Sequence, residues 1–174
     1  MGVYVKEFYP MQGCKGEKIL SLLTEQSMRT KSVNFEVYHS DSEWNLYWNM
    51  EIPPIDFLPV MKKYAKKEAI LQEAMKDEIV LREVLKLSKT YVCQLSVEEV
   101  AIIKRIVEKG LPDLNRRKPQ GLDGHSYELK LYTSEKEYRC WCVIPKEWKE
   151  LIPLIKLFVA KAELNERYLI DGIN

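Results

Sequence analysis

The stretch VNFEVYHSDSEWNLYWNM, residues 33–50, decides the fold. Apolar and polar side chains alternate along its first half and again along its second half. A period of two residues is typical of a half-buried β-strand. Between the halves, residues 40–43 (SDSE) carry short polar side chains that can hydrogen-bond to nearby amides in a turn. We therefore predict a β-hairpin that pairs a strand at 32–39 with a strand at 44–51.

A second hairpin follows the same pattern closer to the C-terminus. Apolar side chains alternate over 127–131, residues 133–136 (TSEK) form a turn, and the alternation resumes over 138–144. Pro145 and Pro153 then bracket a short helical turn, and Pro153 fits the first turn of a final helix, where its missing amide costs nothing. The apolar face of that helix comprises Leu154, Leu157, Phe158 and Ala162.

Helical spacing of apolar residues fills most of the remaining chain. It predicts a helix over about 15–28 and an interrupted helix from Asp56 as N-cap to about Ser88, with Pro59 in its first turn. A further helix begins at a capping box of Ser96 and Glu99 and stops at Gly110 and Pro112. A short strand at 2–9 and a polar connection at 113–121 complete the pattern.

The order of elements is therefore hairpin, helices, hairpin, helix. This order predicts the α+β class, with an antiparallel sheet built from hairpins and covered by helices. We expect residues 1–174 to form a single α+β domain in which residues 53–112 are a helical insertion or subdomain.

Composition narrows the possible functions. The 174 residues carry 27 Lys+Arg against 26 Asp+Glu, and this net charge of +1 disfavours general phosphate binding. Residues 1–10 show no secretory signal, and no apolar run is long enough to span a bilayer. Four cysteines fit reduced thiols better than a disulfide framework. We therefore expect a cytoplasmic protein that has no cofactor and does not act at a membrane.

Candidate chemistry is sparse. His39 and His125 end and begin predicted strands, and at one rim of the sheet they could cleave RNA by general acid–base catalysis. Cys14, just ahead of a predicted helix, could be activated by the helix dipole. Cys140 and Cys142 lack the spacing of a zinc pair. The lysine cluster at 62–67 runs directly into glutamates, which disfavours a nucleic-acid-binding stripe.

The first hairpin offers a more specific surface. Tyrosine and tryptophan side chains lie there beside acidic groups, a composition typical of protein-binding patches. Strand alternation places Trp44 and Trp48 on one face of the sheet, where they could equally belong to the core, and Tyr38 and Tyr47 on the other, facing outward. The predicted partner-binding residues are Tyr38, Asp41, Glu43, Trp44, Tyr47 and Trp48.

The C-terminal third carries a resemblance. Residues 121–129 (GLDGHSYEL), residues 138–142 (YRCWC) and the helix from Pro153 are similar to a hairpin-plus-helix pattern found in immunity proteins of bacterial polymorphic-toxin and contact-dependent growth inhibition systems. In this pattern Trp141 is expected to pack against the final helix. The resemblance implies a non-enzymatic antitoxin that binds a cognate protein toxin, expected to be a nuclease, and occludes its active site.

Two alternatives remain open at the level of sequence. One is an RNA-binding or RNA-cleaving protein that uses His39 and His125. The other is an inhibitor or adaptor of another host or phage system, which would use the same surface chemistry.

Overall fold

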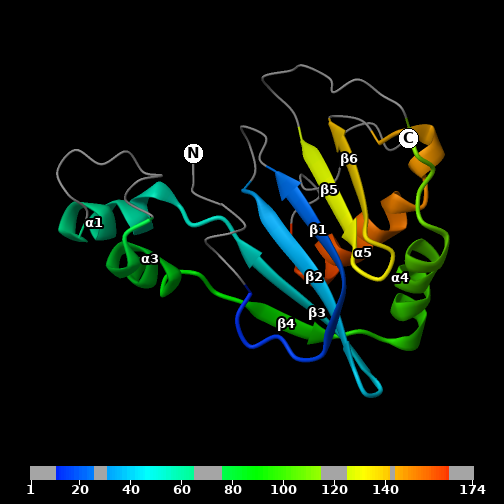
Figure 1. Ribbon diagram of the computed structural model, residues 1–174, viewed down its shortest axis with the longest axis horizontal. Coiled ribbons are helices and arrows are strands. Elements are labelled where there is room, and N and C mark those ends of the chain that lie inside the picture. Colours follow the sequence, from blue (N-terminus) through cyan, green and yellow to red (C-terminus); the bar gives the residue numbers. More distant parts are fainter. Residues whose placement is uncertain (1–10, 26–30, 65–75, 115–124, 142–143, 165–174) are drawn as a thin grey trace.

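The fold is a six-stranded antiparallel sheet with the strand order β4-β3-β2-β1-β5-β6 (Figure 1). The computed structural model describes residues 11–25, 31–64, 76–114, 125–141 and 144–164; the strand predicted at 2–9 and most of the connection predicted at 113–121 lie outside them. The strands are β1 (Glu17–Glu25), β2 (Val33–Ser40), β3 (Glu43–Met50), β4 (Tyr91–Gln94), β5 (Ser126–Leu131) and β6 (Lys136–Trp141).

Both predicted hairpins are confirmed. β2 pairs with β3 from Val33↔Met50 to Ser40↔Glu43, and β5 pairs with β6 from Ser126↔Trp141 to Leu131↔Lys136. The structure therefore confirms the predicted α+β class. It is an antiparallel sheet of hairpins, and helices lie between β3 and β4 in the sequence.

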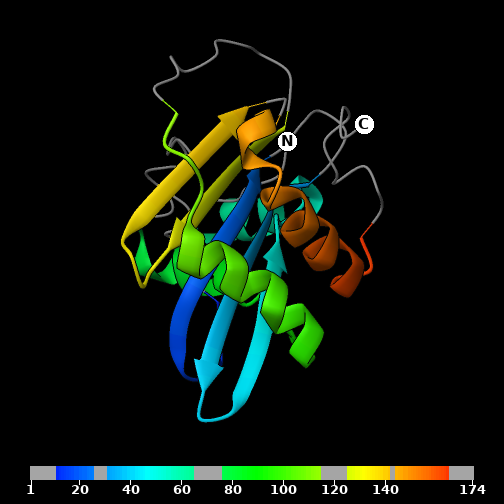
Figure 2. The same cartoon turned by 90° about the vertical axis from the view of Figure 1, so that its right-hand side faces the viewer.

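Two helices cover one face of the sheet, which we call the helix face (Figure 2). They are α4 (Val97–Lys109) and α5 (Leu151–Lys161), and a 3-10 turn (Lys146–Trp148) leads into α5. The predicted capping box at Ser96 and Glu99 is present at the start of α4, and Gly110 is its C-cap. The other face of the sheet, which we call the polar face, is polar at most alternate strand positions, for example Ser21, Asn34 and Glu128. It also carries the apolar Leu23 of β1 and Val92 of β4.

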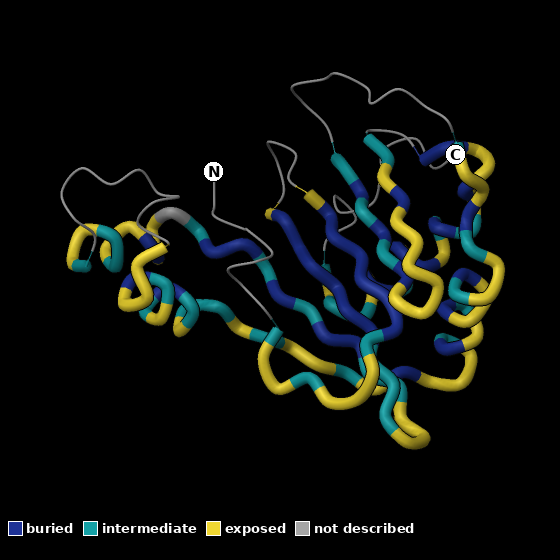
Figure 3. Tube along the Cα trace, viewed as in Figure 1, coloured by how far each residue is buried: buried dark blue, intermediate teal, exposed yellow. Residues whose placement is uncertain are grey.

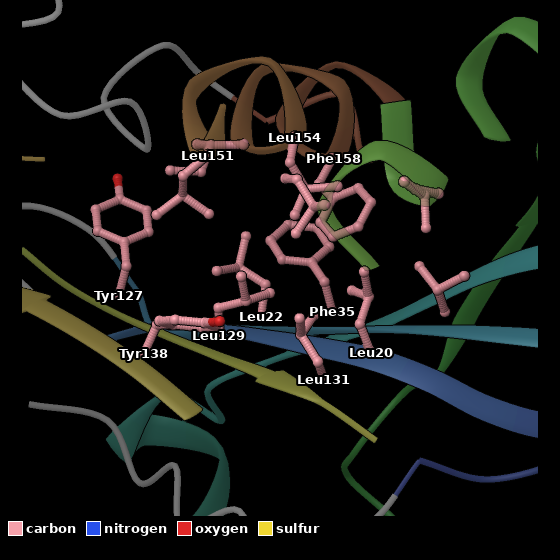
Figure 4. Packing of buried hydrophobic residues seen from close by; sticks show 14 of the residues in the cluster. Leu20, Leu22, Phe35, Tyr127, Leu129, Leu131, Tyr138, Leu151, Leu154 and Phe158 are labelled. Atoms are coloured by element: carbon pink, nitrogen blue, oxygen red, sulfur yellow. The ribbon is translucent and has the colours of Figure 1, made fainter. Parts of the chain in front are cut away.

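The main core lies between the helix face and α5. Leu20, Leu22 and Phe35 point from the sheet toward Leu154 and Phe158 of α5 (Figure 4). The rings of Phe35 and Phe158 are 5.3 Å apart between centroids, and both side chains are fully buried. This packing accounts for the apolar face predicted for the final helix.

A second, smaller core stands apart from the first. The helices α1 (Pro54–Tyr64) and α3 (Glu78–Leu85) pack together at one end of the molecule (Figure 1). Their buried residues are Ile52, Phe57, Val80 and Val84. The interrupted helix predicted from Asp56 to about Ser88 corresponds to α1 and α3, but its start was wrong: α1 begins at Pro54, and Pro59 lies inside the helix rather than in its first turn. Asp77 is the N-cap of α3, and its side chain accepts hydrogen bonds from the Ile79 and Val80 amides.

The helix predicted at 15–28 was also wrong, because this segment is β1. The strand lies between β2 and β5 in the middle of the sheet and is buried on both faces from Ile19 to Thr24 (Figure 3). A doubly buried strand has an almost continuous apolar run, which cannot be distinguished from a buried helix by periodicity. An irregularity between Lys18 and Leu20 shifts the register and further obscures the alternation.

The expected contact of Trp141 with the final helix was wrong. Trp141 pairs with Ser126, which in turn pairs with Glu25, so all three side chains belong to the polar face, away from α5. Tyr138 and Trp148 take the expected place, with ring centroids 5.8 Å apart within the main core. In the described ranges, no helix has the length and apolar character needed to cross a membrane.

Candidate protein-binding surface

The structure distributes the six predicted partner-binding residues over three places. Asp41 and Glu43 lie at the β2–β3 turn. Trp44 and Trp48 belong to the helix face, where both pack against the main core while remaining partly exposed. Tyr38 and Tyr47 lie together on the polar face, where their rings make an edge-to-face contact with centroids 5.3 Å apart. They therefore do not form one continuous patch.

The hairpin tip, residues 39–44, extends beyond the neighbouring strands (Figures 1 and 2). Ser40 and Glu43 close a two-residue turn in which Asp41 has a φ of 51°. Asp tolerates this left-handed conformation better than most residues because its short polar side chain can hydrogen-bond locally. The side chains of Asp41 and Glu43 are consequently held in solvent at the end of a rigid hairpin.

An aromatic pair forms the base of the hairpin tip. The rings of His39 and Trp44 are 4.6 Å apart between centroids, and the Nζ atom of Lys104 in α4 lies 5.7 Å from the Trp44 ring. This stacking and the cation–π contact fix the orientation of Trp44. The tip therefore combines a fixed, half-buried aromatic side chain with two exposed carboxylates.

Tyr47 does not face outward as expected. Its side chain is only 5% exposed, and its Oη atom accepts a hydrogen bond from the Lys15 amide at 3.3 Å. The covering residues belong to what we call the crossing segment, residues 11–16, which precedes β1. Because of this cover, Tyr47 is not available to a partner at the polar face.

The crossing segment follows the polar face from β4 toward β1. The Gln12 amide donates a hydrogen bond to Thr90 Oγ1 at 3.0 Å, next to β4, and Cys14 lies beside the Tyr38 side chain of β2. Gly16 then lies so close to β2 that a Cβ atom placed on it would be 2.3 Å from the His39 carbonyl oxygen. Glycine is therefore required at the point where the segment enters the sheet.

A buried ionic network lies next to the crossing segment. The carboxylate of Glu36, which is 4% exposed, receives Lys18 Nζ at 3.0 Å and the hydroxyl of Tyr38 at 2.9 Å. The side-chain amide of Asn34 donates to the same carboxylate at 3.1 Å. Three partners thus offset the desolvation of Glu36. Burial and then the charge of Glu36 raise the pKa of Tyr38, so its hydroxyl stays protonated and donates.

Sequence reasoning missed this network. The alternation in the strand predicted at 32–39 indicates only a solvent-facing position for Glu36, and the helix predicted over about 15–28 includes Lys18. An alternating strand does indicate that Glu36 and Tyr38 share a face. Its partner Lys18 could not be found without knowing that β1 pairs with β2.

The predicted environment of Cys14 was also wrong. Cys14 precedes a strand rather than a helix, so no helix dipole acts on it. Burial raises the pKa of the Cys14 thiol above its ordinary value, although the hydrogen bond with Tyr38 partly opposes this. A thiol with a raised pKa is a poor nucleophile near neutral pH.

The two histidines do not share a rim of the sheet. His39 pairs with Glu17 at the start of β1, whereas His125 precedes Ser126, which pairs with Glu25 at the end of β1. Eight residues of extended strand separate these positions, or about 26 Å. His39 and His125 therefore cannot act as acid and base on one phosphodiester.

The part of the chain that the structure describes contains no group of three His, Cys, Asp or Glu side chains placed to hold a metal ion. Cys14, Cys93 and Cys140 are free thiols, and Cys142 lies outside the described residues. Of the lysine cluster at 62–67, Lys62 and Lys63 are exposed on α1, while Lys66 and Lys67 lie outside the described ranges.

Comparison with protein-family models, with curated proteins and with solved structures found no match.

Proposed function

We propose that this chain is an immunity protein that binds a cognate bacterial toxin, a nuclease, and occludes its active site. The observation that supports the proposal is the hairpin tip, which presents Asp41 and Glu43 beside the fixed Trp44 side chain. The proposal also rests on the resemblance of the C-terminal third to immunity proteins.

The chemistry of the hairpin tip suits a basic partner. Nucleases bind a polyanion, so the surface around their active site carries lysine and arginine. Two carboxylates at the end of a protruding hairpin can enter such a site and are attracted to it over several ångströms. The partly exposed Trp44 ring, already restrained by His39 and Lys104, loses little further conformational entropy on binding.

The test is protection against the toxin encoded by the neighbouring gene. We expect co-expression of this chain to restore colony formation and the purified proteins to form a 1:1 complex. The double charge reversal Asp41→Lys with Glu43→Lys should weaken binding by about 100-fold. This estimate assumes that each of the two lost contacts contributes ~1–2 kcal/mol to the binding free energy. Binding is measured by calorimetry and protection by colony counts.

A matched control distinguishes the effect of the hairpin-tip carboxylates from the effect of changing the net charge. Glu108→Lys with Asp113→Lys also reverses one Glu and one Asp, both exposed, but outside the hairpin tip. This variant should protect like the unmodified chain, and thermal unfolding should show that both variants are folded. Absence of protection and of binding by the unmodified protein contradicts the proposal. Equal loss in both double variants contradicts the role of the hairpin tip.

The two alternatives are tested by the same experiment. An RNA-cleaving protein that uses His39 and His125 together is disfavoured by their placement at opposite ends of the sheet. An inhibitor or adaptor of another host or phage protein would leave the neighbouring toxin fully active.

A further inference from the structure

The two edges of the sheet differ in chemistry. At the β6 edge, the exposed Glu137 and Arg139 form an ionic square with Lys130 and Glu128 of β5, with N···O distances from 2.6 to 3.3 Å. Charges at an edge strand discourage pairing with another chain. At the β4 edge, Tyr91 is 45% exposed and Val92 is 55% exposed.

The outward main-chain groups of β4 can be assigned from its pairing with β3. The Leu95 amide donates to the Trp44 carbonyl at 2.8 Å, so Leu95 is directed toward β3. Successive residues of a strand direct their N–H and C=O groups to opposite sides. Val92 and Gln94 therefore direct theirs away from β3, and β4 ends the sheet in the described part of the chain.

The charges at the two ends of β4 are opposite, so two copies of this edge are complementary when they lie antiparallel. The exposed Lys89 precedes the strand, and the exposed Glu98 follows it in the first turn of α4. In an antiparallel pair of two β4 strands, the basic end of each strand lies beside the acidic end of the other. A twofold axis produces this arrangement twice in one interface.

We propose that β4 is a dimerisation edge, where a second copy of this chain adds its own β4 in antiparallel orientation. With the axis at Cys93, Val92 of one copy lies opposite Gln94 of the other, and their outward N–H and C=O groups form the new ladder. The pairing also covers the exposed side chains of Tyr91 and Val92. Lys89 of each copy then lies near Glu98 of the other.

The interface is short, because β4 has only four residues. A contact of this size is typical of a transient association rather than an obligate dimer. We therefore expect a concentration-dependent equilibrium between monomer and dimer in the micromolar range. The apolar side chains add burial, and the two charge pairs select the antiparallel register.

Sedimentation velocity of the full chain from about 1 to 300 μM tests the proposal, since this range spans micromolar association. Gln94→Pro removes an amide that faces away from β3 and is expected to leave the β3 pairing intact. It should weaken dimerisation at least tenfold. Val92→Lys places a charge opposite Gln94 of the other copy, next to the twofold axis, and should have the same effect. Thermal unfolding confirms that each variant is folded.

A charge-swap cycle identifies the partner strand. Lys89→Glu and Glu98→Lys should each weaken dimerisation about tenfold, and the double variant should restore it, because the two sites face each other across the interface. Glu108→Lys, elsewhere on α4, is the control and should have no effect. A protein that is monomeric over the whole range overturns the proposal. So does a dimer that is insensitive to the β4 variants, or a double variant that weakens association further.

Discussion

At the scale of single residues, two glycines of the crossing segment make contrasting demands on the backbone. Gly13 and Gly16 both have positive φ values, 72° and 94°. Around Gly13 a Cβ atom would meet nothing within 4 Å, whereas at Gly16 it would overlap the main chain of His39. A substitution at Gly13 therefore tests conformational strain alone, whereas a substitution at Gly16 tests strain together with steric overlap.

We expect Gly16→Ala to lower the free energy of unfolding by about 3 kcal/mol, because it combines a strained φ with a clash against backbone that cannot move aside. Gly13→Ala should lower it by only about 1 kcal/mol, which is the strain alone. Urea unfolding measures both. Equal losses in the two variants would show that the close approach of Gly16 to β2 does not constrain the fold.

Residue patterns also show where sequence reasoning about the site succeeded and where it failed. Asp41 and Glu43 were correctly placed at a turn, since turn chemistry is local. The cover over Tyr47 was missed because it comes from Lys15, which lies 32 residues earlier in the sequence. Local patterns indicate which face a strand residue belongs to, but they do not reveal which segment covers that face.

At the scale of elements, a partly buried ion pair links the two helices of the helix face. Lys161 Nζ of α5 lies 2.8 Å from Glu99 Oε1 of α4, and Glu99 also completes the capping box with Ser96. Burial alone would raise the pKa of Glu99, but the hydrogen bond and charge of Lys161, together with the Ser96 amide, outweigh it and hold this pKa below its ordinary value.

A carboxyl with a lowered pKa stabilises the folded state above the pKa it has in the unfolded chain, and this contribution is lost as pH falls through the folded-state pKa. Glu99→Gln keeps a capping acceptor but removes the charge. We expect the variant to be less stable than the unmodified chain by up to about 1 kcal/mol at pH 7, and equally stable near pH 3. Thermal unfolding from pH 3 to 8 measures the difference.

Glu108→Gln is the matched control, because it removes an exposed carboxylate from the same helix. A Glu99→Gln deficit that persists unchanged at pH 3 would mean that geometry, rather than charge, links α4 to α5.

Elements whose ends are marked by capping or terminating residues were predicted well, and elements without such residues were not. The capping box of Ser96 and Glu99 marks the start of α4, and Gly110 marks its end. β1 has no such boundaries and is buried on both faces, so its sequence resembles a helix. β4 was missed because four residues are too few for a period to show.

At the scale of the whole molecule, the two hydrophobic cores differ in size and share no buried residue. Among the described residues, the α1–α3 core has four buried ones, and the main core contains the central strands with α4 and α5. Cooperative units of different stability are expected when clusters make few contacts with each other.

We expect Val84→Ala to cost about 2 kcal/mol and to act locally. Amide hydrogen exchange should become faster in α1 and α3 and remain unchanged in β1, β2 and β5. Phe158→Ala, which removes a ring from the main core, should cost about 3–5 kcal/mol and accelerate exchange throughout the sheet. Faster exchange across the sheet in Val84→Ala would show that the two cores unfold as one.

The place of β1 in the sheet has a consequence for synthesis of the chain. β1 leaves the ribosome about a hundred residues before one of its two partners, β5: Glu25 and Ser126 bond across a separation of 101 positions. At a translation rate of about 5–20 residues per second, the nascent sheet waits roughly 5–20 s for its second half. During that interval the β1–β2–β3 meander exposes Leu20 and Leu22 along an open edge, so the newborn chain is most vulnerable to aggregation before its last third emerges.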